Sequence, residues 1–233
     1  MLDIPDGIRA LLFDLDGVLT QTAKVHAAAW KEMFDRVLAE RGLPEFDARS
    51  DYEAYVDGKP RLDGVRSFLD SRGIAHDDEL VRRLGDEKND LVLELIRTRG
   101  VETYAGSVAF VRVAKEAGLR CAVVSSSANT RDVLSITGIA DLFEARIDGL
   151  VAEERGLPGK PAPDTFLAGA EALGVPPAAA AVFEDALAGV EAGRAGDFGW
   201  VVGVDRTGHG AELSEHGADV VVEDLSELMQ GDA

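Results

Sequence analysis

A short apolar run at residues 8–13 ends abruptly in the acidic sequence Asp14-Leu15-Asp16-Gly17. A run that is apolar throughout is typical of a strand buried on both faces of a parallel sheet. The pattern predicts further strands at 119–124, 178–183, 200–204 and 219–222, and helices at 108–117, 130–137, 165–173 and 186–195. Strands that alternate with helices predict an α/β fold with a doubly wound parallel sheet.

The segment after the first strand has a different pattern. Apolar residues recur at helical spacing from Thr22 to about Gly42, and no strand pattern follows before residue 100. Short helices are expected at 52–56, 65–69, 80–84 and 91–96, separated by Gly58, Gly73 and Gly85. We therefore expect an α/β core domain of residues 1–22 and 104–233, with an inserted all-helical domain of residues 23–103.

Charge and composition narrow the function further. The 233 residues include 24 Lys and Arg against 43 Asp and Glu, a net charge of −19. Such a charge repels phosphate backbones, so neither nucleic acid nor an anionic membrane surface is an expected partner. A lone Cys121 and scattered histidines give no disulfide and no zinc-ligand spacing. With no signal peptide pattern and no membrane-spanning apolar run, we expect a cytoplasmic protein.

Polar residues follow the predicted strands at the sheet edge where ligands of parallel sheets bind. The first strand is followed by Asp14 and Asp16, the second by the serines 125–127, and a third by the pair 184–185, Glu-Asp; Lys160 lies in a loop. Carboxylates, a hydroxyl and an ammonium suit phosphoryl transfer through an aspartyl phosphate, because the attacking carboxylate needs the phosphate's charge to be cancelled.

Each group has an expected role in that chemistry. Asp14 is the candidate nucleophile, and Asp16 is placed to protonate the leaving oxygen and later activate the acceptor. Lys160 would neutralise the transferring oxygens, and Ser125 and Ser126 with nearby backbone N–H groups would bind them. Several carboxylates at one edge require a cation, and hard oxygen ligands favour Mg²⁺. The predicted magnesium ligands are Asp14, Asp16, Glu184 and Asp185.

Structural roles compete with these assignments. The Asp-Gly sequence at Asp16 is common in turns, and the pair at 184–185 fits the first turn of a helix. The serines at 125–127 suit helix capping, and Lys160 suits a solvated charge. The four motifs taken together favour function, because they occur on successive predicted strand ends.

Those motifs resemble the haloacid dehalogenase superfamily. The similarity rests on residues 13–20 (FDLDGVLT), Ser125, residues 159–164 (GKPAPD) and residues 183–189 (FEDALAG), in that order along nearly the whole chain. The resemblance implies a Mg²⁺-dependent phosphatase or phosphomutase, and Asp16 argues against the dehalogenase branch, which lacks that second acid. It also implies that the inserted helices form the family's small cap.

Within the superfamily, the insert resembles the β-phosphoglucomutase branch. His26 and Trp30 lie four apart on one helical face, and residues 58–61 (GKPR) resemble a substrate-binding loop. The resemblance implies that the arginine of this loop holds the phosphate that is not transferred, a role that suits bidentate binding. The substrate-binding residues that it implies are His26, Trp30, Gly58, Arg61, Lys88, Ser127 and Asn129.

Two positions depart from that branch. Ala128 stands where a basic residue is expected, and Gln21 replaces the usual Asp after the first motif. The resemblance implies interconversion of β-glucose 1-phosphate and glucose 6-phosphate; a phosphatase of a small phosphate ester is the alternative, and a catalytically silent binding module is a more remote one. The expected partner is a small sugar phosphate. The sequence carries no signal of oligomeric state, and a monomer is compatible with it.

Overall fold

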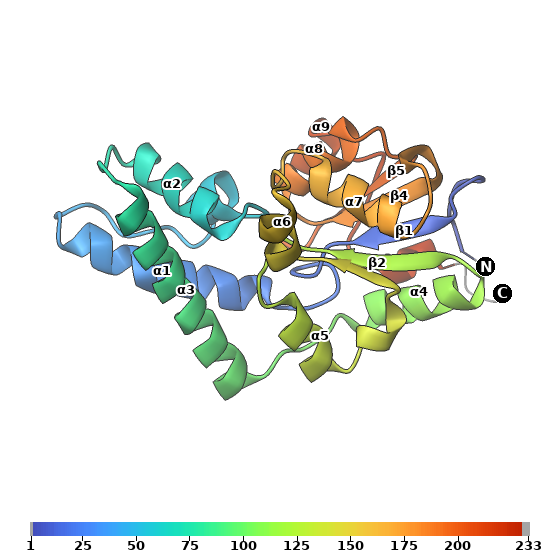
Figure 1. Ribbon diagram of the computed structural model, residues 1–233, viewed down its shortest axis with the longest axis horizontal. Helices are drawn as coiled ribbons and strands as arrows, with labels where there is room; N and C mark the ends of the chain where they lie inside the picture. Colours follow the sequence, from blue (N-terminus) through green and yellow to red (C-terminus); the bar gives the residue numbers. More distant parts are fainter. Residues whose placement is uncertain (1, 230–233) are drawn as a thin grey trace.

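A computed structural model describes residues 2–229 of the protein (Figure 1). Its centre is one parallel sheet with the strand order β3-β2-β1-β4-β5-β6. The strands are β1 (Ala10–Phe13), β2 (Arg120–Val124), β3 (Ala145–Ile147), β4 (Ala180–Glu184), β5 (Trp200–Val204) and β6 (Val220–Val222). The expected α/β class and parallel sheet are therefore confirmed.

Helices cover both faces of this sheet, because alternate residues of each strand point to opposite faces. On β1, Leu11 and Phe13 pack with α4, α5 and η4, whereas Ala10 and Leu12 pack with α7, α8 and α9. These elements are α4 (Ala105–Glu116), α5 (Thr130–Thr137), α6 (Gly149–Arg155), α7 (Asp164–Ala172), α8 (Leu187–Ala195), α9 (Gly210–Glu215), and the short turns η2 (Ala140–Leu142), η3 (Pro177–Ala179) and η4 (Leu225–Leu228).

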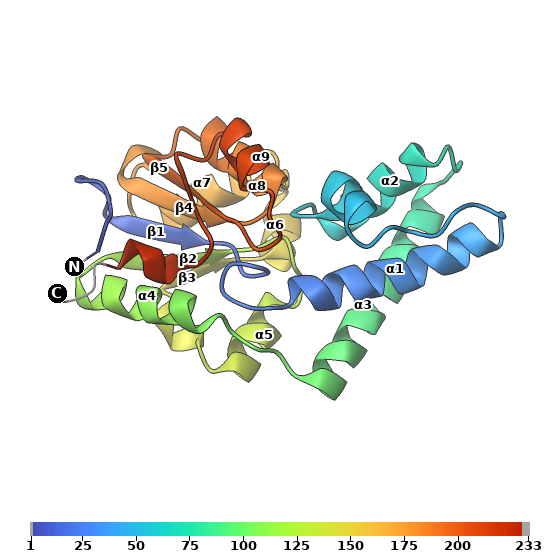
Figure 2. The ribbon, with the colours of Figure 1, turned by 180° about the vertical axis from the view of Figure 1, so that it is seen from behind.

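Between β1 and α4 the chain forms a separate helical group beyond the end of the sheet (Figures 1 and 2). We call α1 (Ala23–Ala39), η1 (Tyr52–Val56), α2 (Arg61–Ser71) and α3 (Asp78–Arg99) the inserted helices. They have a core of their own, in which the ring centroids of Trp30 and Phe34 are 5.2 Å apart and those of Phe34 and Phe68 4.1 Å apart. Within the described residues, no helix is long and apolar enough to span a membrane.

Three local expectations were incomplete. The segment 80–96 was expected to break at Gly85, but α3 runs through it as one helix of 22 residues. A Cβ at Gly85 would lie 2.7 Å from Leu62 Cδ2, so this glycine allows α2 to pack closely against α3. The edge strand β3 was missed because Arg146 interrupts its apolar pattern, whereas the equally short β6 consists of three valines. The short helices α6 and α9 were also missed.

Candidate active site

The carboxyl ends of three neighbouring strands, β2, β1 and β4, bring the predicted core motifs together. Asp14 follows β1 and its N–H donates to the carbonyl oxygen of Phe183 on β4 at 3.0 Å. Ser125 follows β2, and Glu184 is the last residue of β4. The side-by-side order of these strands therefore places residues far apart in the sequence at one sheet edge, as parallel topology requires.

Lys160 lies beneath this edge and joins two of the carboxylates. Its Nζ is 2.5 Å from Asp14 Oδ1, contacts Glu184 Oε1, and donates to the carbonyl oxygen of Val124 at 3.3 Å. The residue is only 2% exposed. The sequence predicts that Lys160 neutralises the transferring oxygens, and in the structure it contacts Asp14, the candidate nucleophile.

Burial sets the proton affinity of these groups. It raises the pKa of Asp14 to about 6 and that of Glu184 to about 7, although the Lys160 ammonium opposes both shifts. Burial alone would lower the pKa of Lys160, but the charges of Asp14 and Glu184 outweigh it and raise that pKa above its ordinary value. Lys160 is therefore a permanent cation between two carboxylates that ionise near neutrality.

An acidic cluster is formed at the same edge by Asp14, Glu184 and Asp185. One carboxylate oxygen from each lies within 4.8 Å of the others. Burial, and then the charges of neighbouring carboxylates, raise the pKa of Asp185 well above its usual value. An all-oxygen donor set of this spacing fits a hard divalent cation.

Asp16 is not part of that cluster and contacts residues on both sides of the junction between the core and the insert. The Thr22 hydroxyl donates to Asp16 Oδ1, and His26 Nε2 lies 3.8 Å from the same oxygen. Burial raises the pKa of Asp16, and the Thr22 hydrogen bond opposes the shift. A raised pKa favours a carboxyl that must both give and take a proton. Its assignment as a magnesium ligand stays a prediction.

Two of the predicted substrate residues form a chain toward Asp16. Lys88 Nζ donates to His26 Nδ1 at 3.1 Å and lies 4.8 Å from the centroid of the Trp30 ring. Burial lowers the pKa of Lys88 to about 7, although the Asp16 charge opposes this, and burial followed by the Lys88 charge lowers the pKa of His26 well below its usual value. A neutral His26 can therefore accept the hydrogen bond from Lys88 at its Nδ1 atom.

The loop after η1 docks the inserted helices on the core. The Ser126 hydroxyl donates to the carbonyl oxygen of Gly58 at 2.8 Å. Gly58 has a φ of +68°, and a Cβ there would lie 3.0 Å from Ala186 Cβ. A Cβ at Gly159 would lie 2.0 Å from Pro60 Cγ, so glycine is required on both sides of this contact. Asn129 Nδ2 also donates to Asn89 Oδ1 across the boundary at 3.0 Å.

One cavity collects nearly all of the predicted residues. Its lining includes Asp14, Asp16, His26, Trp30, Gly58, Arg61, Lys88, Ser125, Ser126, Ser127, Asn129, Glu184 and Asp185, while Lys160 lies below it. Arg61 contributes a buried Nε that has no hydrogen-bond partner among the described residues. The Ser125 and Ser127 hydroxyls accept hydrogen bonds from the N–H groups of Ser127 and Asn129, so they shape the turn before α5, although no side chain that the structure describes caps that helix.

The cavity also has lining residues to which sequence reasoning assigned no role, among them Tyr52 and Asp57. Both belong to the insert, close to the docking loop. The available signal for Asp57 was an acidic residue directly before the loop of residues 58–61.

Comparisons with known sequences and structures point to the same family. A family model described as haloacid dehalogenase-like hydrolase matches residues 8–197. The chain is 53% identical to the β-phosphoglucomutase of Mycobacterium tuberculosis, over 98% of this chain and 94% of that protein. It is 29% identical to hexitol phosphatase A of Escherichia coli, over 94% and 93% of the two chains. The β-phosphoglucomutase structure from Clostridium difficile has a TM-score of 0.80 and 27% identity, covering 95% and 93%.

Proposed function

Because the chain belongs to the haloacid dehalogenase-like hydrolase family, we propose that it transfers phosphoryl groups through an aspartyl phosphate on Asp14. The observation that carries this proposal is the 2.5 Å contact between Lys160 Nζ and Asp14 Oδ1, in the same cavity as a second acid, Asp16. A fixed ammonium beside the nucleophile reduces its repulsion of an incoming phosphate. The chain is thus an enzyme of this family, as its relatives are.

The two aspartates divide the chemistry. A carboxylate oxygen of Asp14 attacks phosphorus, and the bond from phosphorus to the leaving oxygen breaks. Asp16 gives its proton to that oxygen and, in the second half of the reaction, takes a proton from the hydroxyl that attacks the phosphoaspartate. The raised pKa of Asp16, caused by its burial, supports this double role.

Asp14, Glu184 and Asp185 fit a Mg²⁺ ion by their donor chemistry and their mutual spacing. We propose that they hold it, with Asp16 as the remaining member of the predicted set. When bound, the ion would supply positive charge against the oxygens of the transferred phosphoryl group.

The inserted helices, as a cap domain of residues 23–103, would close over the core of residues 1–22 and 104–233. The contact of Ser126 with Gly58 supports a docked state in which water is excluded from the cavity. Water exclusion would allow a sugar hydroxyl to accept the phosphoryl group in place of water. A small phosphate ester is the proposed partner, and the cytoplasmic location stays a prediction.

The proposed substrate pair is β-glucose 1-phosphate and glucose 6-phosphate, after the relative at 53% identity. A mutase must hold a second phosphate while the first is transferred. Arg61 supports this, because its buried Nε lacks a partner among the described residues and its Nη2 only approaches the exposed Asp86 at 3.6 Å. Ser127, Asn129, His26, Trp30 and Lys88 would complete the sugar phosphate site.

Phosphorus NMR tests the reaction directly. The protein is mixed with Mg²⁺, β-glucose 1-phosphate and a trace of glucose 1,6-bisphosphate as primer. We expect the glucose 6-phosphate signal to grow without free phosphate, and Asp14→Asn to abolish the conversion. Accumulation of free phosphate alone would overturn the mutase assignment, and the absence of any turnover would overturn phosphoryl transfer of this substrate.

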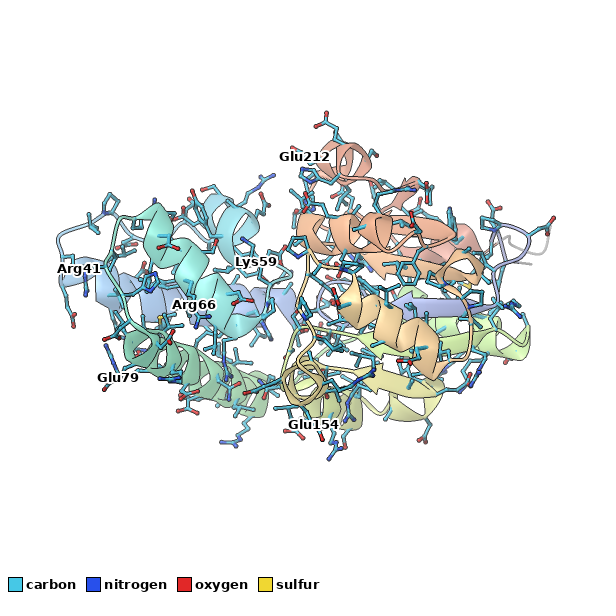
Figure 3. The ribbon with its side chains drawn as sticks, turned by 45° about the horizontal axis from the view of Figure 1, so that its top comes forward. Arg41, Lys59, Arg66, Glu79, Glu154 and Glu212 are labelled. Carbon is cyan, nitrogen blue, oxygen red and sulfur yellow. The ribbon has the colours of Figure 1, made fainter. Side chains whose placement is uncertain are left out.

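A matched pair of arginine variants tests the second phosphate site. Arg61→Ala should lower mutase turnover at least tenfold, because charged hydrogen bonds contribute about 1.5–3 kcal/mol each. Arg66→Ala is the control on the same helix: Arg66 pairs with Asp63 and Asp78, and Figure 3 shows it farther from the core than Lys59. Equal turnover of the two variants would contradict the assignment of Arg61.

A phosphatase of a small phosphate ester is the second candidate, and Ala128 favours it. Ala128 lines the cavity between Ser127 and Asn129 without adding a charge, which would weaken the hold on a bisphosphate. The similarity to a hexitol phosphatase agrees with this alternative. The NMR experiment separates the two candidates by product, and Ala128→Lys should increase the ratio of glucose 6-phosphate to free phosphate if the missing charge is the cause.

A further inference from the structure

Asp57 is a carboxylate of the insert that the proposed mechanism does not use. It directly follows η1, and its N–H donates to the carbonyl oxygen of Tyr52 at 3.0 Å. It lines the active-site cavity together with Glu184 and Asp185. Asp57 and Asp185 also line a second cavity, so both residues border the two spaces.

The core carboxylates of Glu184 and Asp185 act on Asp57, whereas a hydrogen bond from the Tyr52 side chain and the charge of His209 lower its pKa. Burial raises the pKa of Asp57 to about 7, and the strongest charge acting on it is that of Glu184. For Asp185, the strongest charge is that of Asp57. Within residues 2–229, neither Asp57 nor Asp185 has an ion-pair partner within 4.0 Å, whereas Asp14 and Glu184 share Lys160.

The contacts that dock the inserted helices on the core also fix the position of Asp57. The neighbouring Gly58 is fixed by Ser126 and packs against Ala186, the residue that follows Asp185. Pro60 packs against Gly159 on the other side of the loop. The docked loop therefore holds a carboxylate of the insert against carboxylates of the core, and their repulsion opposes docking until a cation lies between them.

We propose that Asp57 couples cation binding to docking: a divalent cation held by Asp14, Glu184 and Asp185 draws Asp57, and with it the inserted helices, onto the core. This inference rests on the metal site of the proposed function. Because coupling is reciprocal, docking strengthens cation binding by the same factor by which the cation strengthens docking. The enzyme thus closes readily only when the cation needed for transfer is present.

Two measurements on the full chain test the coupling without using activity. Calorimetric titration with Mg²⁺ alone gives its affinity, and small-angle X-ray scattering with and without Mg²⁺ gives the radius of gyration. For the wild type, we expect Mg²⁺ to reduce the radius of gyration. For Asp57→Asn, which keeps the side-chain shape, we expect at least fivefold weaker Mg²⁺ binding, a metal-free form more compact than that of the wild type, and a smaller response to Mg²⁺.

Two further variants control for folding and for net charge. Asp57→Lys should dock without Mg²⁺, because the new cation replaces the missing charge, so its radius of gyration should be small at every Mg²⁺ concentration. Glu79→Gln removes one negative charge from α3 at a site that Figure 3 shows far from the core, and it should behave like the wild type. Circular dichroism confirms that each variant is folded.

The outcomes separate this inference from the proposed function. If Asp57→Asn binds Mg²⁺ and contracts like the wild type, the coupling is wrong while phosphoryl transfer stands. Equal weakening by Glu79→Gln would also overturn it, because the effect would then be one of net charge. If the wild type binds no Mg²⁺ and yet turns over substrate in chelator, the metal site itself is wrong, and the coupling fails with it.

Discussion

Replacement of Lys160 by Met should destabilise the metal-free core by an amount that depends strongly on pH. Lys160 is 2% exposed and its ammonium contacts both Asp14 and Glu184. Removing one partner of a buried ion pair costs about 3–5 kcal/mol, because the remaining charge is left unpaired. We expect this loss of unfolding free energy at pH 8, above the wild-type pKa values of about 6 and 7, where both carboxyls of the wild type are ionised and pair with Lys160.

At pH 5 the loss should be less than half as large. The folded-state pKa values of Asp14 and Glu184 are raised above their ordinary values of 3.8 and 4.5, so the folded state binds more protons than the unfolded state in this window. Their contribution to stability is thus complete below pH 4 and is lost as the pH rises through 6 and 7. Near pH 5 the carboxyls of the variant are largely protonated, and no unpaired charge is buried.

Urea unfolding followed by tryptophan fluorescence measures this loss. The chain has two tryptophans, and Trp30 lies in the inserted helices while Trp200 lies in β5. A Trp30→Phe background therefore reports the core alone. A loss of 3–5 kcal/mol shifts the urea midpoint by about 2 M. Lys115→Met is the control, because it removes a half-buried lysine of α4 that donates to the carbonyl oxygen of Asp141 and contacts no carboxylate of the described residues. An equal loss at both pH values would refute the reasoning.

Three further results are expected. Gly58→Ala should lower kcat/KM about tenfold, because a side chain at a φ of +68° costs about 1–2 kcal/mol and the new Cβ meets the core. The control Gly73→Ala, at a φ of +64° with open space around it, should lower stability and leave activity unchanged. A coupled enzyme assay compares the two variants. Burial lowers the folded-state pKa of Lys88 to about 7, so between pH 7 and 10.5 the unfolded state binds more protons and the wild type should become more stable as the pH rises. Lys88→Met should remove this rise, which urea midpoints across the range measure. Cys121 is fully buried, and this burial raises its pKa to about 12. It should therefore resist iodoacetamide at pH 8 until urea unfolds the core, and mass spectrometry measures the modification.

The core motifs could be placed from the sequence because their position depends on strand ends. Asp14, Ser125 and Glu184 each follow or end an apolar run, and parallel strands carry such residues to a common edge. That these residues lie together could therefore be predicted without any distance between them. The edge strand β3 was beyond this method, because the charged Arg146 at its centre leaves no apolar run in its three residues.

The contacts between the insert and the core were harder to foresee. Gly85 reads as a helix breaker, but its lack of a side chain serves the packing of α2 against α3, a long-range contact that local propensity does not encode. A role for Asp57 could not be predicted either, because it also depends on long-range contacts. Its importance comes from Glu184 and Asp185, which lie more than a hundred residues away along the chain. Pairwise charge effects of this kind depend on tertiary structure.

The position of β1 at the middle of the sheet has a consequence for how the protein is made. β1 leaves the ribosome first, but its sheet partners β2 and β4 begin only at Arg120 and Ala180. At about 5–20 residues per second, synthesis of β4 follows that of β1 by roughly 10–30 s. The inserted helices, with their own aromatic core, emerge within that interval and can fold before the sheet that carries the nucleophile exists. During translation, the part proposed to recognise the substrate can therefore form ahead of the part proposed to react with it.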